Sequence, residues 1–226
     1  MNKLYWIIGA GILLTQAAFA QPGEGQVQLQ KLSAPAPHYL PEYTYDVTVD
    51  TMSWIKQQPG LHVAFGSTDE LYLRCEVPAV NQESLTWEGT GWRGERLNTQ
   101  VLVWSPDTIE QIRIRVSDLL SAEGNKISVD NIKLNMVRYV LSDYPYGATN
   151  FGCDTPPEGA WLMPDRLEAF ERFNLPEKTV RPVWIALEIP RTAEPGKYNG
   201  TIEINSIQSK VTLKVTITVQ KQILPE

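Results

Sequence analysis

The strongest structural signal in this sequence is a strict alternation of apolar and polar residues near its end. The apolar members are Val211, Leu213, Val215, Ile217 and Val219, and the residues between them are Thr or Lys. Because successive side chains of a β-strand point to opposite faces, this period of two predicts a strand with one buried face. Such a strand needs a second layer over its apolar face, so a packed sheet is expected.

Other runs with apolar and β-branched residues recur along the chain. They span residues 43–49, 61–65, 71–73, 97–104, 112–116, 127–141, 183–189 and 198–204. The turn residues Gly66 to Asp69 between the second and third runs predict a hairpin, and Glu194-Pro195-Gly196 predicts a further turn. The run from Ile127 to Leu141 is long enough for two strands, or for one bent strand with a bulge near Asn131.

One stretch, from Pro164 to Phe173, suggests a helix. It places Leu167 and Phe170 on one side and Asp165 in the first turn. The segment from Pro145 to Pro164 is rich in Gly and Pro, shows no periodicity and predicts a long loop. The expected fold is therefore all-β: a two-sheet antiparallel β-sandwich, of the jelly-roll or immunoglobulin-like kind, with one short helix and this Gly/Pro-rich loop.

Residues 1–20 have the three parts of a secretory signal peptide: a start with Lys3, an apolar run from Leu4 to Leu14, and Ala18-Phe19-Ala20. The apolar run is too short to span a bilayer, and no cysteine follows Ala20 to carry a lipid. We therefore expect export to the periplasm, the extracellular space or the cell surface of a bacterium, without membrane attachment after cleavage. Residues 21–40 are expected to form a flexible leader and 41–222 the sandwich. Residues 223–226 are expected to begin a linker to a C-terminal domain absent from this chain.

Charge and motif content exclude several kinds of partner. The sequence has 20 Lys and Arg and 26 Asp and Glu, and loss of Lys3 leaves 19 against 26, a net charge of −7. An acidic surface repels phosphate backbones, so nucleic acid is not expected. No glycine-rich phosphate loop precedes a helix, and no cofactor is expected. The two cysteines and the distant His38 and His62 lack the spacing of a zinc site, so no metal is expected.

The two cysteines, Cys75 and Cys153, allow two interpretations. An oxidising compartment would permit a disulfide, which would close a loop of roughly 80 residues and stabilise the fold by about 4 kcal/mol in the chain-entropy model. The alternative is two separate buried thiols. The separation of the two Cα atoms decides between them, and both interpretations stay open.

The residues favour binding or support over catalysis. Glycoside hydrolysis needs two carboxyl groups held on a rigid scaffold, and the one adjacent acidic pair, Asp69-Glu70, falls in a predicted turn. The carboxylates of Glu95, Asp143 and Asp154 are distant in sequence and could converge in space, which their spacing alone does not decide. A serine or cysteine nucleophile lacks a recognisable basic partner. No catalytic residue is therefore assigned.

Aromatic residues in loop-like segments offer another kind of site. Sugar rings stack on Trp and Tyr, but large aromatics more often serve cores and interfaces, and the second role is favoured here. The tract from Trp87 to Arg93 interleaves two Trp rings with glycines and one cation. The candidates for contact with a ligand or with another domain are Trp87, Trp92, Arg93, Glu95, Arg96, Tyr144, Tyr146 and Trp161.

Four phrases together resemble one family. They are residues 92–100 (WRGERLNTQ), 137–140 (VRYV) with Gly152-Cys153, 180–184 (VRPVW) and 195–201 (PGKYNGT). They are similar to segments of the N-terminal domain of glycoside hydrolase family 123, although the family's Gly-Cys-Gly is Gly152-Cys153-Asp154 here. The resemblance implies a β-sandwich that precedes a (β/α)₈ barrel acting on terminal N-acetyl-β-galactosaminides. In that family the catalytic Asp-Glu pair belongs to the barrel, so no catalytic residue transfers to this chain.

The resulting functional prediction is a non-catalytic accessory domain that supports or orients a glycosidase barrel. Its docking face is expected to include Trp92, Trp161 and neighbours in the 145–164 loop. The alternatives are a stand-alone periplasmic or surface carbohydrate-binding module and, third, an assembly subunit with an exposed edge strand.

Overall fold

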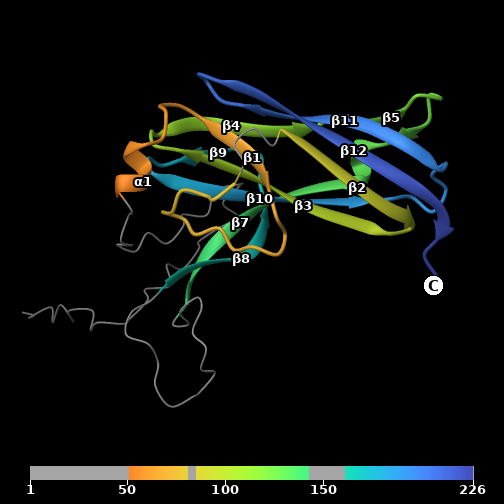
Figure 1. Ribbon diagram of the computed structural model, residues 1–226, viewed down its shortest axis with the longest axis horizontal. Coiled ribbons are helices and arrows are strands. Elements are labelled where there is room, and N and C mark those ends of the chain that lie inside the picture. The colour runs from red at the N-terminus through yellow and green to blue at the C-terminus, as the bar shows by residue number, and fades with distance from the viewer. Residues whose placement is uncertain (1–50, 81–84, 143–160, 226) are drawn as a thin grey trace, which may run out of the picture. The chain divides into compact units, whose positions relative to one another are not determined.

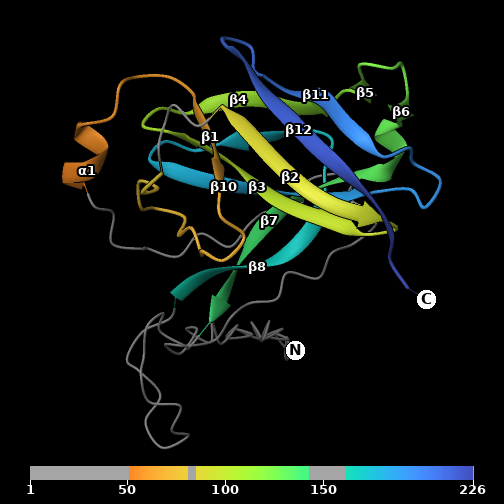
Figure 2. The same cartoon turned by 45° about the vertical axis from the view of Figure 1, so that its right-hand side comes forward.

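The computed structural model describes residues 51–80, 85–142 and 161–225. These residues form an all-β sandwich of two sheets, which Figures 1 and 2 show from two sides. The expected fold class is therefore confirmed. The strand predicted at 43–49 and most of the 145–164 loop lie outside the described residues. Within the described ranges, no helix combines the length and hydrophobicity needed to cross a bilayer.

The first sheet has five strands, and every neighbouring pair in it is antiparallel. In spatial order they are β1 (His62–Gly66), β3 (Arg96–Ser105), β10 (Thr179–Glu188), β7 (Ile132–Ser142) and β8 (Trp161–Ala169). β10 is the central strand, and its Val183 lies opposite Val101 of β3 and Met136 of β7. The predicted strands at 97–104 and 183–189 are confirmed here.

The second sheet has seven strands. Its main path is β2 (Thr86–Arg93), β12 (Lys210–Ile223), β11 (Gly196–Asn205), β4 (Ile109–Val116) and β9 (Phe173–Leu175). Two short strands, β5 (Leu119–Ser121) and β6 (Lys126–Ile127), extend from β11. β2 runs parallel to β12, whereas the sequence predicted antiparallel sheets throughout. The connection that makes them parallel spans most of the chain, so no local turn signal marks it.

The core lies between the two sheets. The alternation in β12 is confirmed, because Leu213, Val215, Ile217 and Val219 are buried between the layers. Thr216 departs from the pattern, since it is buried as well, and its hydroxyl donates to Asn199 Oδ1 at 3.0 Å. That hydrogen bond satisfies the polar group on the side of the sheet away from the core.

A second apolar cluster covers the outer face of the five-stranded sheet. It consists of Trp54, Ala64, Tyr72, Leu102, Trp104 and Val180. Trp54 belongs to the short helix α1 (Thr51–Ile55), and its indole Nε1 donates to the carbonyl of Cys75 at 2.8 Å. This bond joins the helix to the irregular segment 67–80, and the two together cover one end of the outer face.

The predicted position of the helix is wrong. Residues 161–169 form β8, an edge strand paired with β7, and residues 173–175 form β9. In a strand, residues two apart share a face, which allows the ion pair between Arg166 and Glu168. Glu168 also lies 3.6 Å from the guanidinium of Arg138 on β7. Pairing with the preceding strand, β7, thus prevails over a weak helical periodicity.

Two further expectations are revised by the structure. Residues 71–73 form no strand, so the hairpin with residues 61–65 is wrong, and the backbone N–H of Ser67 instead donates to the hydroxyl of Tyr72 at 2.8 Å. Residues 127–141 follow the two-strand alternative. β6 and β7 are separated by a 3₁₀ turn, η1 (Val129–Asn131), capped by the Ser128 side chain.

Candidate interaction surface and groove

The turn between β2 and β3 holds three of the candidate residues. The carboxylate of Glu95 accepts a hydrogen bond from the backbone N–H of Trp92 at 2.7 Å, and the backbone N–H of Glu95 donates to the Trp92 carbonyl at 3.1 Å. Gly94 has φ +87°, which a side chain would strain. The turn is therefore stabilised by hydrogen bonds between its own residues, and the Glu95 carboxylate binds the backbone N–H of Trp92.

The same turn is fastened to the end of β12. Leu224 N–H donates to the Arg93 carbonyl at 2.8 Å, and the Arg93 guanidinium donates to the Lys221 carbonyl at 2.9 Å. Arg191 adds a third link, from Nη1 to the Leu224 carbonyl at 2.8 Å. Figures 1 and 2 both show the end of β12 beside the end of β2. The path of residues 221–224 is thereby set by the sandwich.

Three large apolar side chains are exposed at this end of the sandwich. They are Trp92, 43% exposed, Ile223, 43% exposed, and Leu224, 38% exposed. We call these three residues the β2-end surface. Large apolar side chains exposed at one end of a domain are typical of contacts with another domain or protein.

Arg96 belongs to a surface ion network. Its guanidinium lies 2.5 Å from Glu188, and Lys133 lies 3.5 Å from the same carboxylate. The hydrogen bond from Arg96, followed by the charge of Lys133, lowers the pKa of Glu188 below its ordinary value. These three side chains join β3, β10 and β7 across the sheet.

Trp87 lies in strand β2 and packs against the core, so the tract 87–93 is a strand and not a loop. Its ring centroid lies 6.4 Å from that of Phe65 in the opposite sheet. Trp87 thus joins the two layers of the sandwich.

Several candidates cannot be placed. Tyr144, Tyr146, Cys153, Asp143, Asp154 and His38 lie outside the described residues, and Trp161 begins β8 without a described side chain. Cys75 is buried, and its pairing with Cys153 stays a prediction. Among the residues that the structure describes, no group of three His, Cys, Asp or Glu side chains could hold a metal ion.

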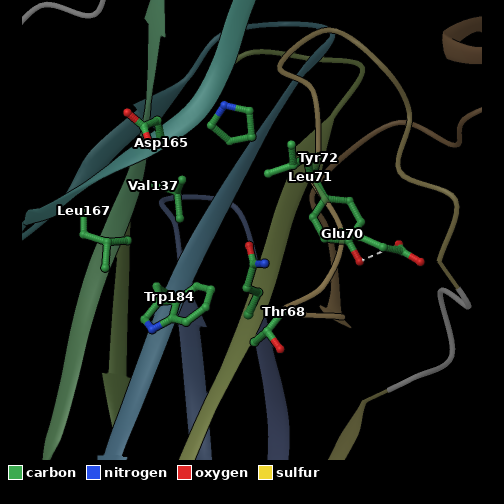
Figure 3. A pocket seen from close by; sticks show the side chains of 10 residues that line it. Thr68, Glu70, Leu71, Tyr72, Val137, Asp165, Leu167 and Trp184 are labelled. Carbon is green, nitrogen blue, oxygen red and sulfur yellow. Dashed lines mark hydrogen bonds between the residues drawn. The ribbon is translucent and has the colours of Figure 1, made fainter. Parts of the chain in front are cut away.

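A groove of about 250 Å³ opens on the outer face of the five-stranded sheet. Its lining residues are Thr68, Glu70, Leu71, Tyr72, Gln100, Val137, Pro164, Asp165, Leu167 and Trp184. Figure 3 shows Trp184, Val137 and Leu167 on one side, with Thr68 and the hydrogen-bonded pair of Glu70 and Tyr72 on the other. Sequence reasoning did not select Trp184 or Gln100 as site residues. The one feature of the sequence that pointed to them is that both lie in segments that resemble the family. Gln100 is the last residue of segment 92–100, and Trp184 is the last residue of segment 180–184.

The fold defines a two-sheet sandwich whose accessible features are an apolar end surface and a mixed groove. Residues 65–206 match the model of the glycoside hydrolase 123 N-terminal domain, and the chain therefore belongs to this family. Among solved structures, the chain resembles a family 123 glycoside hydrolase from Clostridium perfringens, with 25% identity and a TM-score of 0.62. The match covers 73% of this chain and 28% of that enzyme. The chain thus spans less than a third of the length of that relative.

Other matches are weaker. The CooA pilin subunit from enterotoxigenic Escherichia coli is 9% identical with a TM-score of 0.36, over 73% of this chain and 99% of the pilin. MyfA, the major subunit of Myf fimbriae from Yersinia enterocolitica, is 11% identical with a TM-score of 0.32, over 70% of this chain and 98% of MyfA. Neither similarity is close enough to support an argument about function. No curated protein matches the chain.

Proposed function

We propose that this chain is a non-catalytic accessory domain of a glycoside hydrolase. It supports and orients a catalytic (β/α)₈ barrel that acts on N-acetyl-β-galactosaminides. The observation that carries the proposal is the β2-end surface beside the fixed segment 221–224. Three hydrogen bonds to Leu224 and Lys221 set the direction in which the chain leaves the sandwich. A barrel that follows this segment would start from a defined position and would cover Trp92.

The size of the exposed side chains is consistent with this role. Interfaces between domains of one chain bury roughly 600–1,500 Å² and are more polar than obligate interfaces. A tryptophan side chain buries on the order of 150–250 Å² in total, and the 43% of Trp92 that is exposed is the part left for an interface. Trp92 with Ile223 and Leu224 therefore suits the centre of such an interface, while Arg93 and Glu95 hold the turn that presents the ring.

The first test reads the coding sequence that follows the codon for Glu226. We expect a barrel-encoding sequence in the same frame or in the adjacent gene. The longer protein is then made with Trp92→Ala and assayed on p-nitrophenyl N-acetyl-β-D-galactosaminide. Because Trp92 would lie in the interface, we expect a lower melting temperature for the barrel and reduced kcat/KM.

Ile207→Ala is the matched control, because Ile207 is 71% exposed in the turn between β11 and β12, away from the β2-end surface. It should change neither quantity. A genome without a neighbouring barrel sequence contradicts the proposal. A barrel that is equally stable and active with Trp92→Ala contradicts the assigned docking surface.

The proposal includes export. The supporting observation is the layout of residues 1–20, with Lys3 before the apolar run and Ala18-Phe19-Ala20 after it. Mass spectrometry of protein recovered from the bacterial periplasm or medium should find Gln21 as the first residue. Recovery of the intact Met1 form from the cytoplasm would refute this part of the proposal.

A further inference from the structure

The groove on the outer face of the five-stranded sheet combines an apolar side and a polar side. Its place follows from the register of three strands, because Trp184 of β10 lies opposite Gln100 of β3 and opposite Asn135 of β7. Val137 lies two residues farther along β7, on the same face, and opposite Leu167 of β8. The segment 67–72 closes the far side. The groove is thus built on paired strands, which hold side chains more rigidly than loops do.

The apolar side centres on the indole of Trp184. This ring is half-buried, and its Nε1 donates to the side-chain oxygen of Asn98 at 3.2 Å, which restricts the orientation of the ring. Leu167 and Leu71, 49% and 44% exposed, flank the opening. A fixed aromatic ring beside aliphatic side chains offers a flat apolar platform to a ligand.

The polar side of the groove has Glu70, which is exposed at the opening, and Gln100, which is buried. The Glu70 carboxylate accepts from the Tyr72 hydroxyl at 3.0 Å, and Gln100 Nε2 donates to the Ser67 carbonyl at 3.0 Å, so both side chains have a set position. Asp165 and Thr68 are exposed at the same opening. A carboxylate has about four acceptor sites, so Glu70 can accept further bonds beyond that from Tyr72.

We propose that this groove binds a neutral saccharide. A pyranose ring has apolar C–H faces that stack on an indole, and a rim of hydroxyls that donate to carboxylate and amide oxygens. Glu70 and Asp165 are both acidic, and none of the ten lining residues is Lys or Arg. Anionic sugars would therefore be repelled. The volume of about 250 Å³ lies just below the usual range for small-molecule sites, which suits a single sugar ring.

The site is separate from the proposed barrel contact. The groove belongs to β3, β7, β8 and β10 of the five-stranded sheet, whereas Trp92 lies at the end of β2 in the other sheet. The two assignments can therefore fail independently. A domain with both features would hold a barrel at one place and a glycan at another.

The experiment titrates the full chain with methyl β-D-galactopyranoside and N-acetyl-D-galactosamine, and follows tryptophan indole N–H signals by NMR. Trp184→Phe identifies the Trp184 signal. We expect that signal to shift saturably with at least one of the neutral sugars, with a dissociation constant on the order of 1 mM, typical of weak single-site binding. N-acetylneuraminic acid, which is anionic, should bind at least tenfold more weakly.

Variants distinguish binding in the groove from nonspecific binding elsewhere on the protein. Binding to the variants is followed on the signals of the sugar by saturation-transfer NMR, because Trp184→Ala lacks the indole signal. Trp184→Ala and Asp165→Ala should each weaken binding about tenfold or more, and Trp92→Ala should leave it unchanged. Asp165 is exposed, so its variant tests the groove even if Trp184→Ala fails to fold. The proposal is overturned if neither neutral sugar shifts the Trp184 signal. It is also overturned if Trp92→Ala weakens binding as much as Asp165→Ala, or if the anionic sugar binds as tightly as the neutral ones.

Discussion

At the scale of single residues, Thr99 is an anomaly in the core. It is 2% exposed on β3, and its hydroxyl has no hydrogen-bond partner within the described part of the chain. The residue lines a small cavity of about 10 Å³ with apolar neighbours that include Trp87, Leu187 and Val215. A buried hydroxyl without a partner lowers stability, because its hydrogen bond to water is lost on folding.

Thr99→Val should therefore raise the free energy of unfolding by about 1 kcal/mol, since valine fills the same space without a polar group. Thr216→Val is the matched control and should have the opposite sign, because the Thr216 hydroxyl donates to Asn199. Urea unfolding of both variants measures the two effects. A loss of stability in Thr99→Val would show that its hydroxyl is satisfied in solution.

At the scale of secondary structure, the sequence predicted a strand correctly where the strand's own residues alternate between apolar and polar. β12 and β4 were predicted because their own side chains alternate, as with Ile112, Arg113 and Ile114. β8 was missed because the side chains of residues 161–169 do not alternate, and its pairing with the preceding strand, β7, is not visible in their pattern. The groove was missed for the same reason. Trp184 and Gln100 meet only through the register between β10 and β3, which a single sequence does not encode locally.

Gly200 illustrates why one family-like phrase contains a glycine. A Cβ at this position of β11 would clash with the side chain of Leu119, which packs against it from β5. Gly200→Ala should lower the free energy of unfolding by about 1–3 kcal/mol. In a Leu119→Ala background the same change should cost less, because the space has been opened, and a double-mutant cycle measures this coupling. Equal costs in both backgrounds would contradict the packing argument.

Asp118 connects β5, β6 and η1. Its carboxylate accepts from the Val129 N–H at 2.8 Å and lies 3.3 Å from the Lys126 ammonium, and these contacts, with the Val129 bond the larger cause, lower the pKa of Asp118. A carboxyl group with a lowered folded-state pKa stabilises the fold above its ordinary pKa, and this contribution disappears as the pH falls through the lowered value.

Asp118→Asn should therefore destabilise the protein at pH 7, and the difference from wild type should shrink in acid. Urea unfolding of both proteins at a series of pH values checks the prediction. A difference that stays constant down to pH values well below the ordinary aspartate pKa would contradict it.

At the scale of the whole sandwich, both sheets contribute to one core. Ile217 of β12 is fully buried, and the cluster to which it belongs includes Val101, Val183 and Ile185 from the five-stranded sheet. Loss of this contact should weaken both layers together, since neither sheet has another partner for its inner face.

Ile217→Ala should lower the free energy of unfolding by about 2–5 kcal/mol and keep a single unfolding transition. Far-ultraviolet circular dichroism and tryptophan fluorescence should report the same midpoint. Ile207→Ala, at an exposed turn, should stay within about 0.5 kcal/mol of wild type. Two separated transitions in Ile217→Ala would mean that the sheets unfold independently.

The parallel pairing of β2 with β12 has a consequence for biosynthesis. Among the described strands, β2 pairs only with β12, so it has no such partner until residues 210–223 leave the ribosome. Closure of the sandwich is then a late event that follows translation of the domain. Until residues 210–223 are made, β2 has no partner among the described strands, and the seven-stranded sheet stays incomplete.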